Sequence, residues 1–180
     1  MRKTERYRVK DGANSLWHVY DTVSFWKIMK CFVFIQIGRI TPWMRVKNWL
    51  YRTFLKMELG ERVSLALMVM PDSMFPERIS VGDNSIIGFN TTILAHEYLI
   101  DEYRLGDVKI GKNVMVGANT TILPGVTIGD GAIVSAMTLV HKDVPAGSMV
   151  GGNPMQIIYT AEQMAARKAQ DIPVWSERRH

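Results

Sequence analysis

The sequence has little cysteine, little histidine and no long uninterrupted apolar run. Cys31 is the only cysteine among 180 residues, so an intramolecular disulfide framework and a cysteine-rich zinc site are excluded. Its apolar neighbours favour a buried small hydrophobe over a nucleophile. The four histidines include no pair at the spacing of metal ligands, so we expect no metal requirement.

The most apolar stretch, residues 28–37, is about half as long as a membrane span and contains Lys30 and Gln36. Residues 1–12 are charged throughout, so no secretory signal is expected there. The sequence also lacks the phosphate loop G-x-x-x-x-G-K-[ST] and the nucleophile elbow G-x-S-x-G. We expect a cytoplasmic protein, with peripheral contact to a membrane as the alternative.

Positive charge is concentrated at the front of the chain. Residues 1–60 hold 12 basic and 4 acidic residues, whereas residues 61–180 hold 10 and 13. Helices in the basic region can pack on the rest of the chain and leave a solvated charged face, or residues 15–57 can lie on an anionic membrane. Nucleic-acid binding is the weakest interpretation because no recognition motif accompanies the charge. We favour packing and expect no nucleic-acid partner.

Helical periodicity dominates this basic front region. Residues 23–37 form an apolar stretch of helical length that ends at Gly38. Thr41 and Pro42 then predict a helix start, as N-cap and first helical residue. A stripe at helical spacing follows and is expected to face the core: Trp43, Val46, Leu50, Phe54 and Met57.

Beyond this region the periodicity changes to six residues. Nine positions keep this step and all are Ile or Val, where about two aliphatic residues would be expected by chance. They are Val81, Ile87, Ile93, Ile110, Val116, Ile122, Ile128, Val134 and Val140. The same phase extends backwards more weakly through Val63, Val69 and Phe75. A six-residue unit fits one flat strand and one tight corner, so three units make a coil of about 18 residues.

Two copies of one segment reveal an insertion in the coil. Residues 88–94 (GFNTTIL) recur as residues 117–123 (GANTTIL), with six of seven positions identical. The second copy starts about 11 residues later than one coil of about 18 residues would place it, so a polar loop is expected at about residues 97–109. The loop begins directly beyond His96, so a histidine stands where a polar loop leaves a regular coil.

The periodicities divide the chain into three regions. Residues 1–60 form a basic helical cap, residues 61–159 form the coil, and residues 160–180 form a C-terminal helix and tail. The last region opens on the capping box Thr160-Ala161-Glu162-Gln163, and its helix is expected to reach about Gln170, before Pro173.

The repeated segments resemble the hexapeptide-repeat acyltransferases, close to the maltose and galactoside O-acetyltransferase branch. The matching sequences are VGDNSIIGFNTTILAHE, IGKNVMVGANTTILPGVTIGDGAIVSAMTLVHKDVPAG and GGNP. The resemblance implies a mainly β fold, a left-handed parallel β-helix with an N-terminal helical region, an extruded loop and a C-terminal helix. It also implies a homotrimer with active sites between neighbouring β-helices, and direct acyl transfer from acetyl-CoA without an acyl-enzyme.

The resemblance places the catalytic histidine at His96. A neutral imidazole can take the proton of an acceptor hydroxyl as the new bond forms and pass it to the departing thiolate. Family members hold the oxyanion with backbone N–H groups of the coil that faces the histidine, which correspond here to Gly117 and Ala118. A tight corner of the coil explains Gly117 equally well.

For coenzyme A the resemblance points to Gly117, Ala118, Ala136, Lys142 and Pro154. The chain departs from the family pattern at Gln156, where relatives commonly carry a basic residue for the nucleotide phosphates. It departs again at Met115 and Met137, where relatives often have tryptophan and glycine.

The candidate acceptor-binding residues are Asn90, Glu97 and Asp72. Asn90 precedes His96 in its coil, but Asn119 takes the same place in the next copy without a histidine, so a structural asparagine ladder is an equal alternative. Glu97 belongs to an acidic loop, for which a solvated surface is the alternative. The coil before Val81 is apolar at residues 67–69, and Asp72 is the polar candidate nearest to this stretch.

We therefore expect an acetyl-CoA-dependent O-acetyltransferase that modifies a sugar or glycan-precursor hydroxyl, with His96 as general base. One alternative is a xenobiotic acetyltransferase of the same fold. The other is a non-catalytic β-helical scaffold, which Gln156 mildly favours because it removes a basic contact for coenzyme A.

Overall fold

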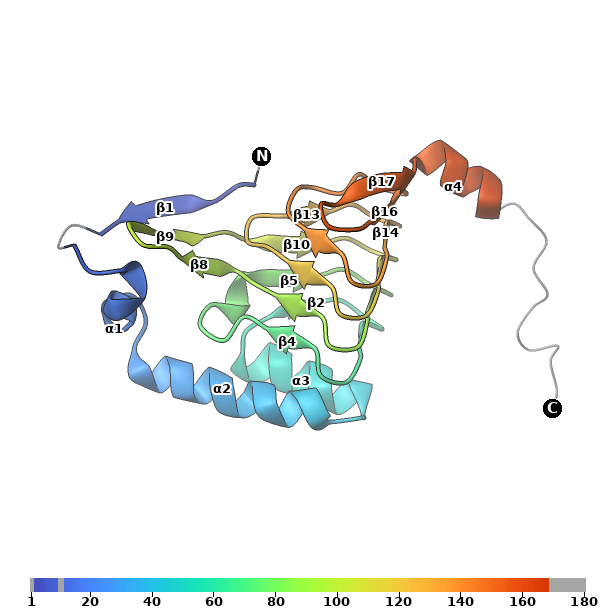
Figure 1. Cartoon of the computed structure of the whole chain (residues 1–180). Coiled ribbons are helices and arrows are strands. Elements are labelled where there is room, and N and C mark those ends of the chain that lie inside the picture. Colours follow the sequence, from blue (N-terminus) through green and yellow to red (C-terminus); the bar gives the residue numbers. More distant parts are fainter. Residues whose placement is uncertain (1, 10–11, 169–180) are drawn as a thin grey trace.

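Three parallel sheets wind around one core as a β-helix (Figure 1). The computed structural model describes residues 2–9 and 12–168. The first sheet contains β2 (Glu58–Leu59), β5 (Ile79–Val81), β10 (Val108–Ile110) and β13 (Thr127–Ile128). The second contains β3 (Ser64–Leu65), β6 (Ile86–Ile87), β11 (Met115–Val116), β14 (Ile133–Val134) and β16 (Met149–Gly151), with β17 (Gln156–Tyr159) antiparallel at its end. The third contains β4 (Met70–Pro71), β7 (Thr92–Ile93), β12 (Thr121–Ile122) and β15 (Leu139–Val140).

The six-residue step places one aliphatic side chain of each strand inside the coil. Val81, Ile110 and Ile128 stand in register in the first sheet and are at most 3% exposed. The position four residues later also points inward and is buried, as at Ser85 and Val114. Each fully buried aliphatic side chain contributes about 1.5–3 kcal/mol, so the stacked rows are the main source of stability.

Asparagines turn several corners of the coil. Asn84, Asn90, Asn113 and Asn119 have left-handed backbone conformations with φ between 55° and 58°, which asparagine tolerates better than most residues. Asn84 Nδ2 donates to Asn113 Oδ1 at 2.8 Å, and Asn90 Nδ2 donates to Asn119 Oδ1 at 2.9 Å. The asparagine ladder therefore exists, and it engages the Asn90 side chain.

The backward extension of the repeat has the wrong phase, at Val63, Val69 and Phe75. A regular coil, like the one that joins Ile110 to its strand partner Ile128, would pair Val81 with Val63. The observed partner of Val81 is Leu59, which lies four positions earlier than Val63. Four extra residues therefore leave the coil between β4 and β5. Val63 and Val69 occupy the second inward position of their units, which is why they are buried and hydrophobic.

Both insertions leave the coil where the third sheet passes to the first, and we call residues 72–78 and 96–107 the insertion corner. The first insertion ends in the 3₁₀ helix η2 (Pro76–Arg78). The second lies where the polar loop is predicted and forms a hairpin of β8 (His96–Tyr98) and β9 (Glu102–Leu105). A strand from the front of the chain, β1 (Glu5–Arg8), pairs antiparallel with β9 (Figure 1). The predicted helical cap is thus not wholly helical.

Two longer helices, α2 (Phe25–Ile40) and α3 (Met44–Phe54), lie across the open end of the first coil (Figure 1). They follow η1 (Ser15–His18) and α1 (Val19–Thr22). The inward side of α3 includes two polar residues, which pair with carbonyl groups of the first coil that have no further coil to pair with. Lys47 Nζ donates to Leu65 O at 2.9 Å, and Asn48 Nδ2 donates to Val63 O at 2.8 Å. Burial lowers the pKa of Lys47 to about 8.

Three expectations for these helices are wrong. Thr41 is the C-cap of α2 and not the N-cap of α3, because α3 begins at Met44 with Trp43 as its N-cap. Gly38 lies inside α2 rather than at its end, and a Cβ there would collide with the ring of Tyr51 on α3, so glycine permits a close crossing. The predicted core stripe lies partly outside: Trp43 and Val46 are 70% and 45% exposed. Lys47 occupies the inward face that the stripe would need.

The last described element is α4 (Ala161–Lys168). The predicted capping box precedes it, because Thr160 N donates to Gln163 Oε1 at 2.9 Å and Gln163 N donates to Thr160 Oγ1 at 3.4 Å. Gln170 and Pro173 lie outside the described residues. Among the helices of residues 2–9 and 12–168, none combines the length and the apolar character needed to cross a membrane.

Candidate active site

Asp72 and His96 meet at the insertion corner, although they are 24 residues apart in the sequence. Asp72 follows β4 and His96 follows the residues that leave β7. These two strands are neighbours in the third sheet, so the segments that leave them lie one above the other. The result is a contact of 2.6 Å between Asp72 Oδ2 and His96 Nδ1.

The Asp72 carboxylate is fully enclosed by hydrogen-bond donors. Its Oδ1 accepts from Met74 N and Phe75 N at 2.8 Å each, and its Oδ2 also accepts from Ala95 N at 2.7 Å. Burial by itself would raise the pKa of Asp72, but the hydrogen bond and charge of His96 and the N–H groups of Phe75 and Ala95 hold it below its ordinary value. The side chain has no exposed surface. Asp72, an acceptor-binding candidate from the sequence, is thus buried with its carboxylate paired to His96.

His96 keeps one ring nitrogen available for chemistry. An ionised Asp72 can only accept a hydrogen bond, so His96 Nδ1 carries the proton and Nε2 holds the lone pair. The ring packs between Phe75 and Tyr98, with centroid distances of 5.8 and 5.3 Å. The side chain is 15% exposed. This arrangement suits a general base that is held in one orientation and one tautomer.

The acidic residues of the hairpin point away from His96. Neighbouring side chains on a strand alternate between faces, so Glu97 lies on the opposite face of β8 from His96. Arg2 pairs with Glu97 at 2.8 Å, and Arg6 pairs with the buried Glu102 at 2.8 Å. Hydrogen bonds from Arg6 and Arg104 lower the pKa of Glu102. Glu97 is therefore occupied in attaching the front of the chain to the hairpin, and its direction does not suit the expected acceptor contact.

The residues expected to bind coenzyme A lie mostly along a different edge of the prism. Gly117, Ala118 and Ala136 follow strands of the second sheet at its corner with the third sheet, and Pro154 lies between β16 and β17 of the second sheet. The acceptor candidate Asn90 also lies at the corner between the second and third sheets. Lys142 alone follows β15 and shares the edge of His96, and its side chain is exposed. Within one subunit, His96 therefore lies on a different edge of the prism from most of the residues expected to bind coenzyme A.

Only one of the two expected oxyanion donors has a free N–H group. Gly117 N donates to Val134 O at 2.7 Å inside the stacked sheet, which leaves no proton for an oxyanion. Gly117 instead has a packing role, because a Cβ there would collide with the backbone of Ala136 in the next coil. Ala118 N makes no hydrogen bond within the described part of the chain.

Residues 107–142 match the family described as bacterial transferase hexapeptide (six repeats). A protein of Bacillus subtilis named "Putative acetyltransferase YvoF" is 71% identical to this chain over 167 residues, covering 93% of this chain and 96% of that protein. The chain belongs to the hexapeptide-repeat acetyltransferases. This membership argues against the alternative of a non-catalytic β-helical scaffold.

Two solved structures share the fold of this hexapeptide-repeat acetyltransferase. A hexapeptide-repeat acetyltransferase of Vibrio cholerae, VCA0836, in complex with acetyl-CoA has a TM-score of 0.63 at 21% identity and covers 85% of this chain and 93% of its own. A maltose O-acetyltransferase of Clostridium difficile has a TM-score of 0.60 at 22% identity and covers 74% and 86%. The predicted left-handed β-helix is confirmed.

Sequence reasoning on this acetyltransferase missed two neighbours of His96. The sequence pattern indicates Asp72 only as a candidate acceptor-binding residue. The signal for its contact with His96 is the four-residue insertion before β5, which starts at Asp72 and leaves the coil at the same corner as the loop after His96. Tyr98 lies two residues after His96 on β8, and strand alternation would have placed it on the same face. Its hydroxyl lies 2.6 Å from Thr22 Oγ1 at the end of α1, which ties the hairpin to the N-terminal helices.

Proposed function

We propose that this acetyltransferase transfers the acetyl group of acetyl-CoA directly to a hydroxyl of a sugar or glycan precursor, with His96 as general base. The observation that carries the proposal is the 2.6 Å contact between the buried Asp72 carboxylate and His96 Nδ1. It fixes the tautomer in which Nε2 can accept a proton. Asp72 is then a positioning residue, because it acts through the imidazole and not on the substrate.

The reaction needs one base and one oxyanion donor. The acceptor hydroxyl gives its proton to His96 Nε2 while its oxygen forms a bond to the thioester carbonyl carbon. The carbon–sulfur bond then breaks, and the coenzyme A thiolate takes the proton back from Nε2. The negative charge of Asp72 stabilises the imidazolium between these two steps, as in other carboxylate–histidine pairs.

We infer that the second half of the site comes from a neighbouring subunit of a homotrimer. The free Ala118 N–H lies on another edge of the prism from His96. The outer face of the second sheet is unusually apolar, with Ile86 and Met115 51% and 42% exposed. Packing of this face against a second β-helix would bury those side chains and supply Ala118 opposite the His96 of its neighbour.

Acetyl-CoA binding is supported by the acetyl-CoA complex of VCA0836. Ala118, Ala136 and Pro154 are the backbone positions that we assign to the pantetheine and nucleotide, with Lys142 as the cation near the phosphates. The sugar acceptor is supported by the maltose O-acetyltransferase, and the single reduced cysteine suits the cytoplasm.

Two measurements test the proposal in sequence. Titration calorimetry should show binding of both acetyl-CoA and coenzyme A, with the coenzyme A site lost when Lys142 and Ala136 are changed together to Glu. Release of free thiol is then measured across sugars, glycan precursors and amines. Acetylation of a hydroxyl supports the proposal, whereas transfer to amines only, or no binding of acetyl-CoA, contradicts it.

A further inference from the structure

The outward side of α2 is apolar, unlike that of an ordinary surface helix. Cys31, Ile35 and Gly38 face the coil and are buried. A surface helix normally carries charged or polar residues on its other side. Here the other side carries five exposed apolar residues at helical spacing: Trp26, Met29, Val33, Ile37 and Ile40.

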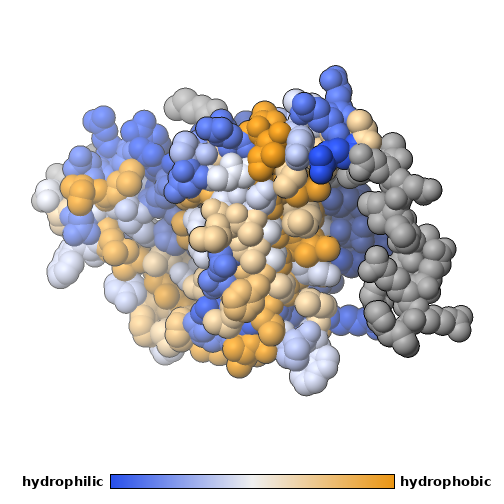
Figure 2. Space-filling view, turned by 45° about the vertical axis from the view of Figure 1, so that its right-hand side comes forward, coloured by the Kyte–Doolittle hydropathy of each residue, from blue (hydrophilic) through white to orange (hydrophobic). Residues whose placement is uncertain are grey.

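The neighbouring helix continues this apolar surface. Trp43, at the start of α3, is 70% exposed, and Val46 and Trp49 are 45% and 57% exposed. We call these three residues, together with the five on α2, the α2–α3 face. The face lies at the end of the β-helix, below the first coil in Figure 1, and apolar residues gather along the lower part of Figure 2.

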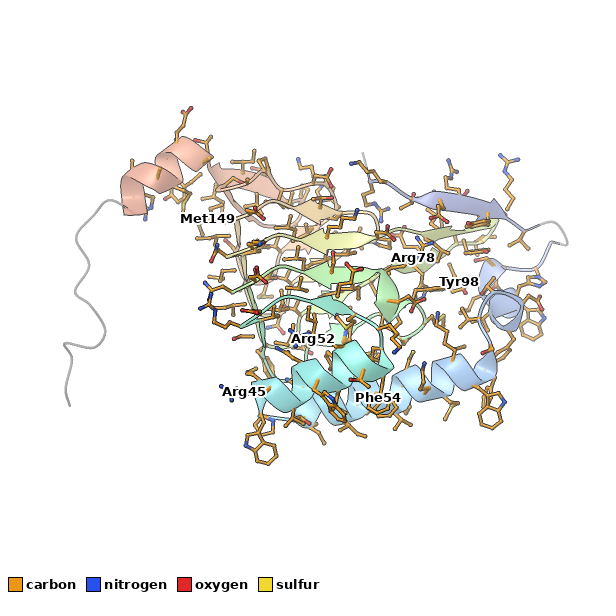
Figure 3. The ribbon with its side chains drawn as sticks, turned by 180° about the vertical axis from the view of Figure 1, so that it is seen from behind. Arg45, Arg52, Phe54, Arg78, Tyr98 and Met149 are labelled. Carbon is orange, nitrogen blue, oxygen red and sulfur yellow. The ribbon has the colours of Figure 1, made fainter. Side chains whose placement is uncertain are left out.

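Basic residues frame this apolar face, and acidic residues are absent from it. The sequence from residue 22 to residue 57 contains seven basic residues and no acidic one. Lys30 follows Trp26 by one helical turn, and Arg45 lies beside Val46 near the start of α3 (Figure 3). Both are exposed, and neither forms an ion pair with any residue that the structure describes. Lys27 differs, because it pairs with Glu77 at 2.6 Å.

We propose that the α2–α3 face docks on an anionic lipid bilayer. Tryptophans belong at the boundary between lipid headgroups and acyl chains, and lysine and arginine beside them meet the lipid phosphates. With 16 residues, α2 is too short to span a bilayer and would lie in its plane. A second copy of the chain fits less well, because a symmetric contact would bring the Lys30 and Arg45 rims of two copies together.

Docking through this face would hold the candidate active site close to the lipid. The Phe75 ring lies 5.8 Å from the His96 ring, and the Lys27 ammonium of α2 lies 4.8 Å from the centroid of the same Phe75 ring. Tyr98 also contacts α1, which directly precedes α2. The docking surface itself does not depend on the reaction proposed above, so the two can fail separately.

Sedimentation of the full chain with vesicles tests the docking surface. We expect binding to phosphatidylcholine vesicles that contain phosphatidylglycerol, weaker binding in high salt, and little binding to phosphatidylcholine alone. The variant K30Q/R45Q should lose about fivefold in affinity per charge for the anionic vesicles. The variant W26S/I40S should lose about tenfold or more.

A matched control separates this face from general stickiness. The variant I157S/I158S removes two exposed apolar side chains from β17, at the other end of the β-helix, and should bind vesicles like the wild type. The circular dichroism spectrum of W26S/I40S should match that of the wild type, which shows that this variant is folded whether or not the proposed reaction is correct. Brominated acyl chains should quench the tryptophan fluorescence of the wild type and quench W26S/I40S less.

Three results would overturn the proposal. The first is equal vesicle binding by W26S/I40S and I157S/I158S, and the second is no binding of the wild type to anionic vesicles at low salt. The third is a larger oligomer in sedimentation velocity that W26S/I40S dissociates, which would assign the face to a second copy of the chain.

Discussion

The regular corners of the β-helix and the insertion corner are built from the same stacked strands but serve different ends. At the regular corners, backbone N–H groups such as Gly117 N are used up in holding one coil on the next. At the insertion corner, one insertion of four residues and one of about eleven leave the stack. Polar groups in these insertions are not needed for hydrogen bonds between stacked coils. The repeat provides most of the stability and the free Ala118 N–H group, and its interruptions provide the Asp72–His96 pair.

The largest expected effect separates two histidines on the same edge. His96→Ala should reduce kcat by about 10²–10⁴-fold because the reaction loses its general base. His141→Ala is the matched control, two coils further on, where Nδ1 only approaches Leu139 O at 3.2 Å. It should leave kcat within about twofold and melt like the wild type, whereas His96→Ala should stay folded but melt lower, because it removes the partner of the buried Asp72 carboxylate. Comparable losses in the two variants would count against a special insertion corner.

A substitution inside the regular coil should show the opposite pattern. Ile122 is fully buried in β12, and Ile122→Ala should lower the free energy of unfolding by about 2–4 kcal/mol through lost burial and a cavity. Urea denaturation measures this loss. The kcat of the remaining folded protein should be nearly unchanged. A large fall in kcat without a loss of stability would show that the two regions are not separable.

The buried carboxylate should link stability to pH. Because the pKa of Asp72 is lowered in the folded state, its contribution is fully present above the ordinary Asp pKa, near 4, and is lost as pH falls through the lowered value. Asp72→Asn should therefore flatten the acid side of the stability curve. It should also reduce kcat about 10–100-fold with little change in KM for acetyl-CoA, since Asp72 positions His96. If Asp72→Asn changed the stability curve but left kcat unchanged, Asp72 would have only a structural role.

The smallest effect concerns the asparagine ladder. Asn119→Ala should cost about 1 kcal/mol because φ is 55° there, whereas Asn119→Gly should cost less. Asn90→Gly should behave in the same way if its side chain serves only the ladder. An acceptor KM that rises in Asn90→Gly but not in Asn119→Gly would instead restore the acceptor role of Asn90.

The coil and its larger insertion could be predicted because they are written into local periodicity. The step from Ile110 to Val140 and the offset between GFNTTIL and GANTTIL locate both. The smaller insertion could not be predicted in the same way. Counting back from Val81 in steps of six leads to Val69 and Val63, which are aliphatic but occupy the second inward position of their units.

The remaining features depend on contacts that no local pattern encodes. Asp72 reaches His96 in the next coil, and β1 joins β9 through pairs such as Tyr7 with Tyr103, which lie far apart in the sequence. The inward polarity of α3 follows from the need to pair carbonyl groups of the first coil, a need that appears only once the coil is built. Such partners are chosen by tertiary structure.

Chemical rescue of His96→Ala tests the central claim most directly. Thiol release by this variant is measured at saturating acetyl-CoA and acceptor while imidazole is added to the buffer. The rate should rise in proportion to the neutral imidazole concentration, and the rate of the wild type should not change, because a free base replaces the missing ring. A variant that binds acetyl-CoA normally, yet shows wild-type turnover without imidazole, would contradict the assignment of His96 as the base.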